Sequence, residues 1–233
     1  MISIIHKGRF GNRLFQMSAA VFLSRKLKVK INNKIEDILE YDSTGYNQEQ
    51  VNNSIIVNTS NILAISEQEQ CSSNLILDCY FQEKEIINKF IQYNKYQSDI
   101  KTPQDKTFVH IRLGDIKSEK LNLDYSYYEN CIESINPKYD IVISSDSIDD
   151  PIVQRLKDKY NAEVINMKEK QTILFGASCK NKILSHGTFS WWIGFLGNVI
   201  YTDNSMNTLC PSLDRIHREW HGDIFPMFDW KIY

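Results

Sequence analysis

The stretch Phe108-Val-His-Ile-Arg-Leu-Gly-Asp115 decides the fold, because an apolar run breaks abruptly into His110, Arg112 and Asp115 around one glycine. This pattern is typical of a buried strand that ends in a ligand site. In open α/β sheets, ligands bind beyond the carboxyl ends of the strands, where a guanidinium can hold two phosphate oxygens in a fixed fork. A strand end that carries only a surface ion pair is the alternative for this stretch taken alone.

On both sides of this stretch, short runs rich in Val and Ile alternate with longer segments of helical period. This alternation predicts repeated β-α units and a largely parallel sheet. The predicted strands are residues 2–6, 29–31, 75–79, 107–112, 140–144, 163–166, 182–185 and 199–202, with a short one at 55–57. The predicted helices are residues 12–27, 83–92, 125–135, 151–160, 170–177 and 189–196.

The sequence also indicates a division into two halves. Residues 93–106 carry charges, glutamine and Pro103 between two β-α blocks, so we interpret them as a linker. A chain of 233 residues is long enough for one large or two small α/β domains. We therefore expect two nucleotide-binding-type halves joined near residue 100, with the polar stretch 42–70 mostly on the surface.

Composition argues against several classes of protein. The formal net charge is −2 and no basic stripe is present, so a nucleic-acid partner is not expected. No stretch approaches twenty apolar residues, so we expect no membrane span, while peripheral contact with a membrane stays open. The five cysteines lack metal-ligand spacing and follow no signal peptide, which predicts reduced core thiols in a cytoplasmic protein. The oligomeric state is not predicted.

Glycine is concentrated where loops would approach a ligand. Six of the nine glycines fall in three short segments: Gly8, Gly11, Gly114, Gly187, Gly194 and Gly197. Loops that pass close to a ligand favour glycine, which has no side chain to obstruct them. The segment His6-Lys-Gly-Arg-Phe-Gly-Asn12 lies between a strand and a helix, which predicts Asn12 at the helix start beside free N–H groups. A plain turn with an N-cap is the alternative.

Two further strand ends carry polar side chains. Ser185-His-Gly-Thr-Phe-Ser-Trp-Trp-Ile-Gly194 opens a helix whose first N–H groups and hydroxyls could cap it or hold a diphosphate. We interpret Trp191 and Trp192 within it as core residues. After another strand, Ser145 and Asp146 could contact a nucleotide or merely cap a turn. Because carboxyl ends of parallel strands meet at one edge, we expect these segments to lie together.

The chain resembles the α-1,2-fucosyltransferases of glycosyltransferase family 11 through three ordered motifs: Gly8-Arg-Phe-Gly-Asn-Arg-Leu-Phe-Gln16, His110-Ile-Arg-Leu-Gly-Asp115 and Gly187-Thr-Phe-Ser-Trp-Trp192. Three further segments are similar to the pattern of that family: Leu77-Asp-Cys-Tyr-Phe-Gln82, Tyr127-Tyr128 and Glu219-Trp220. The first motif is also similar to the opening of protein O-fucosyltransferases, a more distant group with the same fold. The resemblance extends over most of the chain.

The resemblance implies an α/β fold of the GT-B type in a compact version, with two facing Rossmann-like domains. Residues 1–100 would form the acceptor-side domain and residues 101–233 the nucleotide-sugar-binding domain. The implied reaction is an inverting transfer of L-fucose from GDP-fucose to the 2-hydroxyl of a galactose-terminated glycan, in the synthesis of a surface polysaccharide. The implied partners are therefore a nucleotide sugar and a glycan acceptor.

The resemblance also implies roles for individual residues. Arg112 would contact the donor phosphates, and Asn12 would lie near the reacting centre. The predicted donor-binding residues are Arg112 with Gly8 and Gly11 of the first motif, Gly114 of the second, Ser145 and Asp146, and Gly187, Thr188, Phe189 and Ser190 of the donor-side motif. His110 and Asp115 are carried over with Arg112 as parts of the same loop. His110 and Asp115 are candidates for the base that takes the acceptor proton, although Asp115 could instead orient Arg112. The base stays open.

No metal or other cofactor is expected, because Arg112 can neutralise the leaving phosphate and the sequence has no Asp-x-Asp motif. His217 and His221 are four residues apart, but without further ligands a surface or capping role is favoured over zinc. Two departures from the family pattern are Leu113 in place of a second arginine and Arg13 in place of glutamine. Leu113 leaves another GDP-sugar or a deoxyhexose nucleotide open as the donor. A catalytically silent glycan- or nucleotide-binding domain is the alternative from another class.

Overall fold

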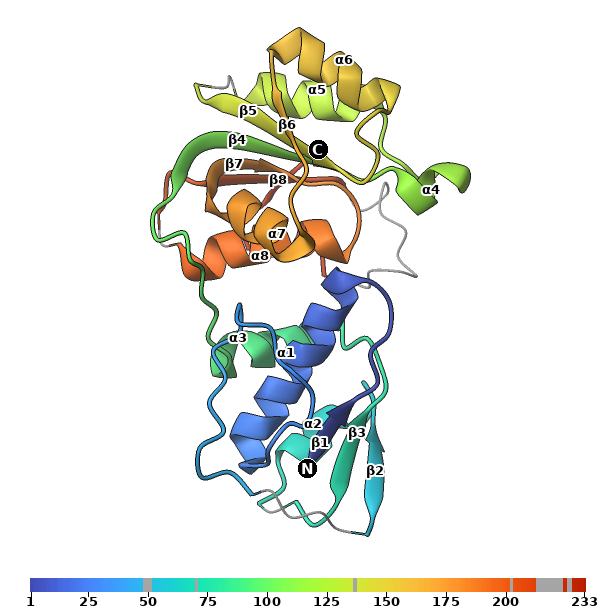
Figure 1. Ribbon diagram of the computed structural model, residues 1–233, viewed down its shortest axis with the longest axis vertical. Helices are drawn as coiled ribbons and strands as arrows, with labels where there is room; N and C mark the ends of the chain where they lie inside the picture. The colour runs from blue at the N-terminus through green and yellow to red at the C-terminus, as the bar shows by residue number, and fades with distance from the viewer. Residues whose placement is uncertain (48–51, 70, 136–137, 202, 213–223, 226–227) are drawn as a thin grey trace. The chain divides into compact units, whose positions relative to one another are not determined.

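The computed structural model describes residues 1–47, 52–69, 71–135, 138–201, 203–212, 224–225 and 228–233. By its internal contacts the chain divides into two units, Met1–Gln97 and Ser98–Tyr233 (Figure 1). The division falls within the segment 93–106. Each unit combines helices with a parallel sheet, so the fold is mixed α/β.

Unit 1, Met1–Gln97, has a three-stranded sheet in the order β1-β3-β2. Its strands are β1 (Ile2–Ile4), β2 (Ser54–Val57) and β3 (Asn74–Leu77), all parallel. Its helices are α1 (Phe10–Leu27), α2 (Ile62–Ser66) and α3 (Lys84–Tyr93). The edge strand β2 leaves Ile55 and Ile56 exposed, whereas the central β3 buries Leu75 and Leu77.

The long helix α1 differs from its predicted bounds at its first turn. It begins at Phe10 after the N-cap Arg9, so Asn12 is its third residue rather than its start. It ends at Leu27, and the C-cap Lys28 closes the last turn with a left-handed φ of 56° and an N–H bond to the Ser24 carbonyl. The strand predicted at 29–31 is present only as isolated bridges to neighbouring segments.

Unit 2, Ser98–Tyr233, has a six-stranded parallel sheet in the order β6-β5-β4-β7-β8-β9. Its strands are β4 (Gln104–Ile111), β5 (Asp140–Ser145), β6 (Glu163–Ile165), β7 (Cys179–Ile183), β8 (Asn207–Cys210) and β9 (Lys231–Ile232). Counted from β4, this is the doubly wound order 3-2-1-4-5-6 of dinucleotide-binding folds. The order reverses between β4 and β7, which makes their carboxyl ends the switch point of the sheet.

Helices cover both faces of this sheet. They are α4 (Gly114–Ser118), α5 (Tyr125–Ser134), α6 (Pro151–Tyr160), α7 (Glu169–Ser178) and α8 (Thr188–Ile200). Figure 1 shows α5 and α6 on one face and α7 and α8 on the other. Capping fixes where two of them begin, since Asp124 accepts the Tyr127 N–H and Asp150 accepts the Ile152 N–H. None of the described helices is both long enough and apolar enough to cross a bilayer.

The prediction of a strand at residues 199–202 is wrong. Helix α8 runs through to Ile200, and the next strand of the sheet is β8, at Asn207–Cys210. The apolar run at the end of α8 belongs to a helix buried on several sides, and a short apolar run does not distinguish such a helix from a strand. The prediction that Trp191 and Trp192 are core residues is confirmed, since both side chains are fully buried.

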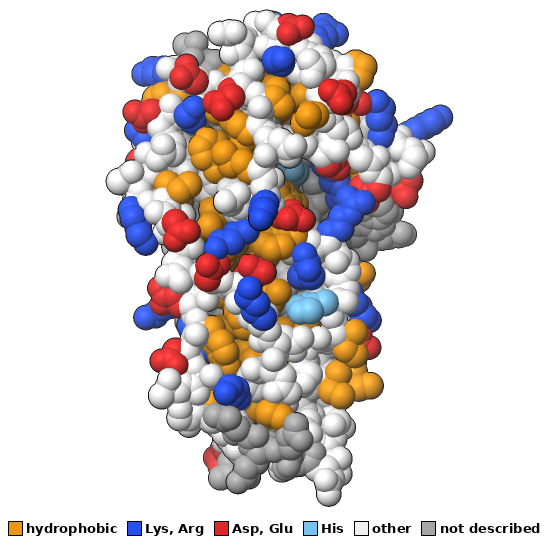
Figure 2. All heavy atoms as spheres, in the orientation of Figure 1, with side chains coloured by type: hydrophobic (Ala, Val, Ile, Leu, Met, Phe, Trp, Pro, Cys, Tyr) orange, Lys and Arg blue, Asp and Glu red, His pale blue; other side chains and the backbone are white. Residues whose placement is uncertain are grey.

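The five cysteines all lie in the described part of the chain, and no disulfide joins them. Cys131, Cys179 and Cys210 are buried, as the sequence predicted for core thiols, whereas Cys71 and Cys79 are half-buried. On the face drawn in Figure 2, Lys and Arg side chains are interspersed with Asp and Glu, as the near-neutral net charge of −2 leads one to expect.

Candidate functional site

The polar segments of unit 2 meet at the switch point between β4 and β7. Direct pairing of these strands ends at Val109 and Ile183. Beyond this point, the segment after β4 leads to α4 and the segment after β7 leads to α8. In doubly wound sheets, the crevice outside such a point is where ligands bind. The prediction that the motifs around Arg112 and Gly187 lie together is confirmed.

Arg112 is the cation of this site. Its Nη2 lies 3.3 Å from each carboxylate oxygen of Asp115, and its side chain is 18% exposed. Gly187 has a φ of +94°, and a Cβ there would come within 2.2 Å of Arg112 Nη1. The guanidinium therefore lies directly against the main chain at Gly187, a position that only glycine allows.

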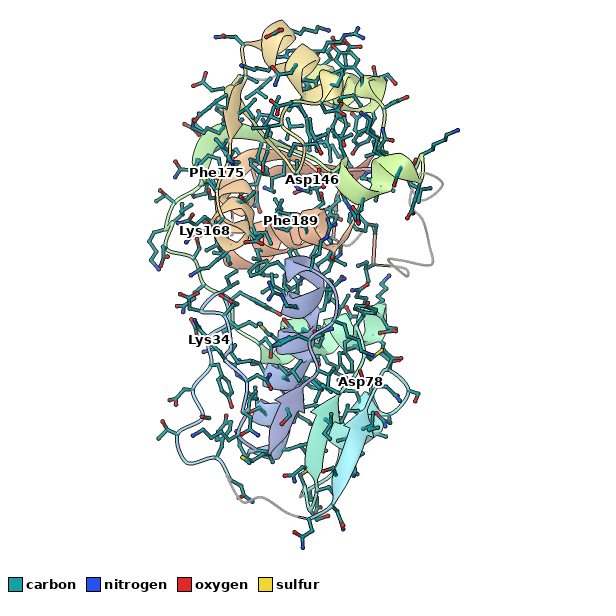
Figure 3. The ribbon with its side chains drawn as sticks, turned by 45° about the vertical axis from the view of Figure 1, so that its right-hand side comes forward. Lys34, Asp78, Asp146, Lys168, Phe175 and Phe189 are labelled. Atoms are coloured by element: carbon teal, nitrogen blue, oxygen red, sulfur yellow. The ribbon has the colours of Figure 1, made fainter. Side chains whose placement is uncertain are left out.

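Asp146 holds the turn that carries Arg112. Its Oδ1 accepts the N–H groups of Leu113 at 2.8 Å and Gly114 at 3.1 Å. A Cβ on Gly114 would lie 2.6 Å from Oδ2, so glycine is needed for this approach. Figure 3 labels Asp146 beside α4. Ser145 caps its own turn instead, since its Oγ accepts the Ser147 N–H at 3.1 Å.

His110 is buried at the centre of the site. Its Nδ1 is 2.5 Å from Ser190 Oγ, and its ring stacks on Phe189 with centroids 5.0 Å apart. Burial, with a smaller contribution from the Arg112 charge, lowers the pKa of His110 to about 4, against the opposing effect of Asp146. The imidazole is therefore neutral near pH 7.

Helix α8 places its N-terminus at the same edge of the sheet. Gly187 is the N-cap, and the helix begins at Thr188, followed by Phe189 and Ser190. The first N–H groups of a helix have no acceptor within it and carry the positive end of its dipole, which suits an anion. His186, which directly precedes Gly187, lines an open cavity of about 300 Å³ together with residues 120–124.

In unit 1, the first motif forms the turn between β1 and α1. Gln16, fully buried, accepts the Lys7 N–H at 3.1 Å through Oε1 and donates to the Lys7 carbonyl at 3.3 Å through Nε2. Gly8 has a φ of +70°, and a Cβ there would lie 2.2 Å from Asn12 Nδ2. Gly11 is buried in the first turn of α1. The loop is thus fixed around the Asn12 amide.

Gln82 is a partner of Asn12 that the sequence did not reveal. Its Nε2 donates to Asn12 Oδ1 at 2.9 Å. The preceding Phe81 is fully buried with a φ of +57°, an unfavourable conformation for a bulky residue that here brings Gln82 to the amide. From the sequence, the segment 77–82 has no predicted role beyond its part in the family resemblance.

Some predictions fall outside the described residues, namely those on His217, Glu219, Trp220 and His221. Among the described residues, no group of three or more His, Cys, Asp or Glu side chains is arranged to hold a metal ion.

The profile of glycosyl transferase family 11 matches residues 15–206, which is most of the chain. The matched range contains the second and third motifs and starts just after Asn12. No curated protein matches the chain. The arrangement of Arg112, Gly187 and α8 at the switch point is suited to a nucleotide-linked substrate, as this enzyme class requires. On the family match, the chain belongs to glycosyl transferase family 11, the family of fucosyltransferases, and is a glycosyltransferase.

Proposed function

We propose that the protein is an inverting transferase that moves L-fucose from GDP-fucose to the 2-hydroxyl of a galactose-terminated glycan, in the synthesis of a surface polysaccharide. One observation carries the donor part of this proposal: the Arg112 guanidinium lies at the switch point, against Gly187 and beside the first turn of α8. A cation and the first main-chain N–H groups of a helix at one edge suit the two phosphates of a nucleotide sugar.

The chemistry explains why a fixed cation matters. Breaking the bond between the anomeric carbon and the phosphate oxygen leaves negative charge on the β-phosphate, while the sugar gains oxocarbenium character. Arg112 would neutralise that charge, with the N–H groups after Gly187 as further donors. The carboxylate of Asp115, 3.3 Å from Nη2, would hold the guanidinium in place. A preorganised donor of this kind commonly contributes about 10²–10³ in rate.

His110 is better suited to hydrogen bonding than to proton abstraction. A pKa of about 4 makes the imidazole a weak base near neutral pH. Since Ser190 Oγ already accepts the Ser185 N–H at 2.9 Å, we assign its hydroxyl proton to His110 Nδ1. The neutral ring would then present Nε2–H to the donor phosphates.

We further propose the GT-B assignment of the two units, with the nucleotide sugar bound by unit 2 and the acceptor by unit 1. Asn12 supports the second part, because an amide held by Gln82 can bind a sugar hydroxyl through neutral hydrogen bonds. We also propose that transfer needs no metal ion, since Arg112 supplies the positive charge and the sequence has no Asp-x-Asp motif.

A different donor sugar is the second candidate, and Leu113 favours it. This position, an arginine in the pattern that the chain resembles, is a fully buried leucine within the core of unit 2. The site therefore has one cation fewer than that pattern, and another GDP-sugar or a deoxyhexose nucleotide would change the contacts beyond the phosphates.

The experiment is a donor panel. Purified protein is incubated in EDTA with lactose or N-acetyllactosamine and each of several nucleotide sugars, release of the nucleotide is followed, and the product linkage is determined by NMR. We expect acceptor-stimulated release from GDP-fucose and an α-1,2-fucosylated product. Turnover of a different donor would overturn the fucose assignment, a requirement for added metal would overturn metal independence, and no turnover with any pair would favour a silent binding domain.

A further inference from the structure

The switch point needs side chains to hold it, because the strand ladder does not reach Arg112. Pairing of β4 with β7 stops at Val109, and β4 itself ends at Ile111. The N–H of Arg112 donates instead to Ser185 Oγ at 3.2 Å, which links the segment after β4 to the segment after β7. A single buried hydroxyl therefore joins the arginine main chain to the loop before α8.

A residue of helix α5 forms a hydrogen bond to the Ser185 hydroxyl. Tyr128, fully buried, lies with its hydroxyl 3.0 Å from Ser185 Oγ. Burial raises the pKa of Tyr128 well above its ordinary value, so the phenol stays protonated and able to donate. Ser185 is also fixed through its main chain, since its N–H bonds to Ser190 Oγ at 2.9 Å. The contacts run from Tyr128 through Ser185 to Arg112.

We propose that Tyr128 is a positioning residue for donor binding, which acts by holding Ser185 Oγ where it fixes the main chain of Arg112. The inference rests on the proposed function, because it assumes that Arg112 binds the donor diphosphate. An arginine anchored at its main chain and paired with Asp115 loses little freedom when a phosphate arrives, and such preorganisation is what makes a charged donor effective.

The same helix offers a matched control in Tyr127. Its ring is buried beside that of Tyr128, with centroids 5.0 Å apart, and its hydroxyl donates to the Leu184 carbonyl at 2.8 Å. Tyr127→Phe removes a buried hydrogen bond to the neighbouring residue, without touching the hydroxyl that reaches Arg112. Both phenylalanine variants should lower the melting temperature by similar amounts, so stability alone does not separate them.

The test is a double-mutant cycle with GDP as the probe, measured by titration calorimetry on the full chain. Tyr128→Phe should raise the Kd for GDP by about 3–10-fold, as loss of one neutral hydrogen bond predicts, and should lower kcat with GDP-fucose by a similar factor. Tyr127→Phe should leave the Kd within about twofold of wild type. In an Arg112→Ala background, Tyr128→Phe should change the Kd by less than about twofold, since the guanidinium that the main chain of residue 112 positions is gone.

Four results would overturn the inference. Tyr128→Phe could raise the Kd equally with and without Arg112, or Tyr127→Phe could raise it as much, and either would make Tyr128 a general stabiliser of the unit. If Arg112→Ala weakens GDP binding while Tyr128→Phe does not, the inference fails and the proposed function stands. If Arg112→Ala binds GDP as tightly as wild type, or if wild type does not bind GDP, the phosphate assignment fails and the inference fails with it.

Discussion

The turns that open α1 and α8 have the same local design and different chemistry. Each follows a parallel strand and has a glycine with positive φ, and in each a Cβ on that glycine would lie 2.2 Å from a side-chain nitrogen. At Gly8 that nitrogen belongs to the Asn12 amide, and at Gly187 it belongs to the Arg112 guanidinium. Backbone geometry therefore brings a donor to both turns, and the charge of that donor decides what each can bind.

The surroundings of the two turns reinforce this difference. The Asn12 amide is held by a second neutral amide, that of Gln82. The Arg112 guanidinium is paired with Asp115, and its turn is fixed by the carboxylate of Asp146. The first arrangement suits hydroxyl groups and the second suits phosphate, as the proposed acceptor and donor sites require.

Removal of the charge should have the largest effect. Arg112→Ala is expected to lower kcat by about 10²–10³, because it removes the cation from the leaving phosphate. The melting temperature should change little, since Asp115, the partner in its ion pair, is exposed to solvent. Arg155→Ala is the control, because that guanidinium stacks 3.7 Å over the Tyr125 ring in the same unit. Equal losses of activity in the two variants would contradict the assignment.

Acid should weaken unit 2 through His110. The pKa of this buried imidazole is about 4 against about 6.5 when unfolded, so the unfolded chain takes up the proton first. The unfolding free energy should fall as the pH drops below 6.5 and level off near 4, by about 3 kcal/mol in all.

Tryptophan fluorescence during urea unfolding measures this, because all four tryptophans follow residue 190 and report on unit 2. His110→Asn should flatten the dependence on pH. An unchanged slope in that variant would show that other groups cause the acid loss.

Substitution of Gly187, the glycine at the charged turn, should reduce activity more than substitution of a glycine whose Cβ position is open. Gly187→Ala is expected to lower kcat by about 10–100-fold, because its Cβ displaces the guanidinium from its place. Gly45→Ala is the matched control: Gly45 also has a positive φ, +77°, but nothing lies within 4 Å of its Cβ position. Both variants should lose about 1–2 kcal/mol of stability from the backbone conformation. Activity should separate them, and equal activities would remove Gly187 from the site.

The neutral turn should show the smallest effect, confined to the acceptor. Gln82→Ala removes one hydrogen bond from the Asn12 amide, so we expect about a 3–10-fold higher KM for lactose or lower kcat, with the Kd for GDP unchanged. Gln97→Ala provides a control, since that amide bonds to the Asp37 carbonyl at 2.9 Å. A weaker GDP affinity in Gln82→Ala would contradict the prediction that this turn serves the acceptor alone.

The sequence was sufficient for the parts of the fold that have a strong local pattern. The strand before Arg112 and the helix Pro151–Tyr160 follow from an apolar run and from proline after a capping aspartate. The predicted strand at 199–202 failed because the buried α8 is apolar on several sides. The strand β9 is two residues long and leaves almost no periodic signal.

The candidate site was predictable in its residues and not in their contacts. The glycines, Arg112 and Asp115 could be selected from the sequence, because loops near ligands need such residues. The role of Asp146 as the acceptor for two N–H groups depends on the register of β4 and β5, which brings together residues more than thirty positions apart. The contacts of Gln82 and Tyr128 likewise arise from tertiary structure alone.

A crystal structure of the protein with GDP would test directly whether Arg112 binds the donor diphosphate. We expect β-phosphate oxygens within hydrogen-bond distance of the Arg112 guanidinium and of the N–H groups that follow Gly187, in the first turn of α8. A diphosphate bound instead at the turn around Gly8 and Asn12, or bound without contact to Arg112, would contradict it.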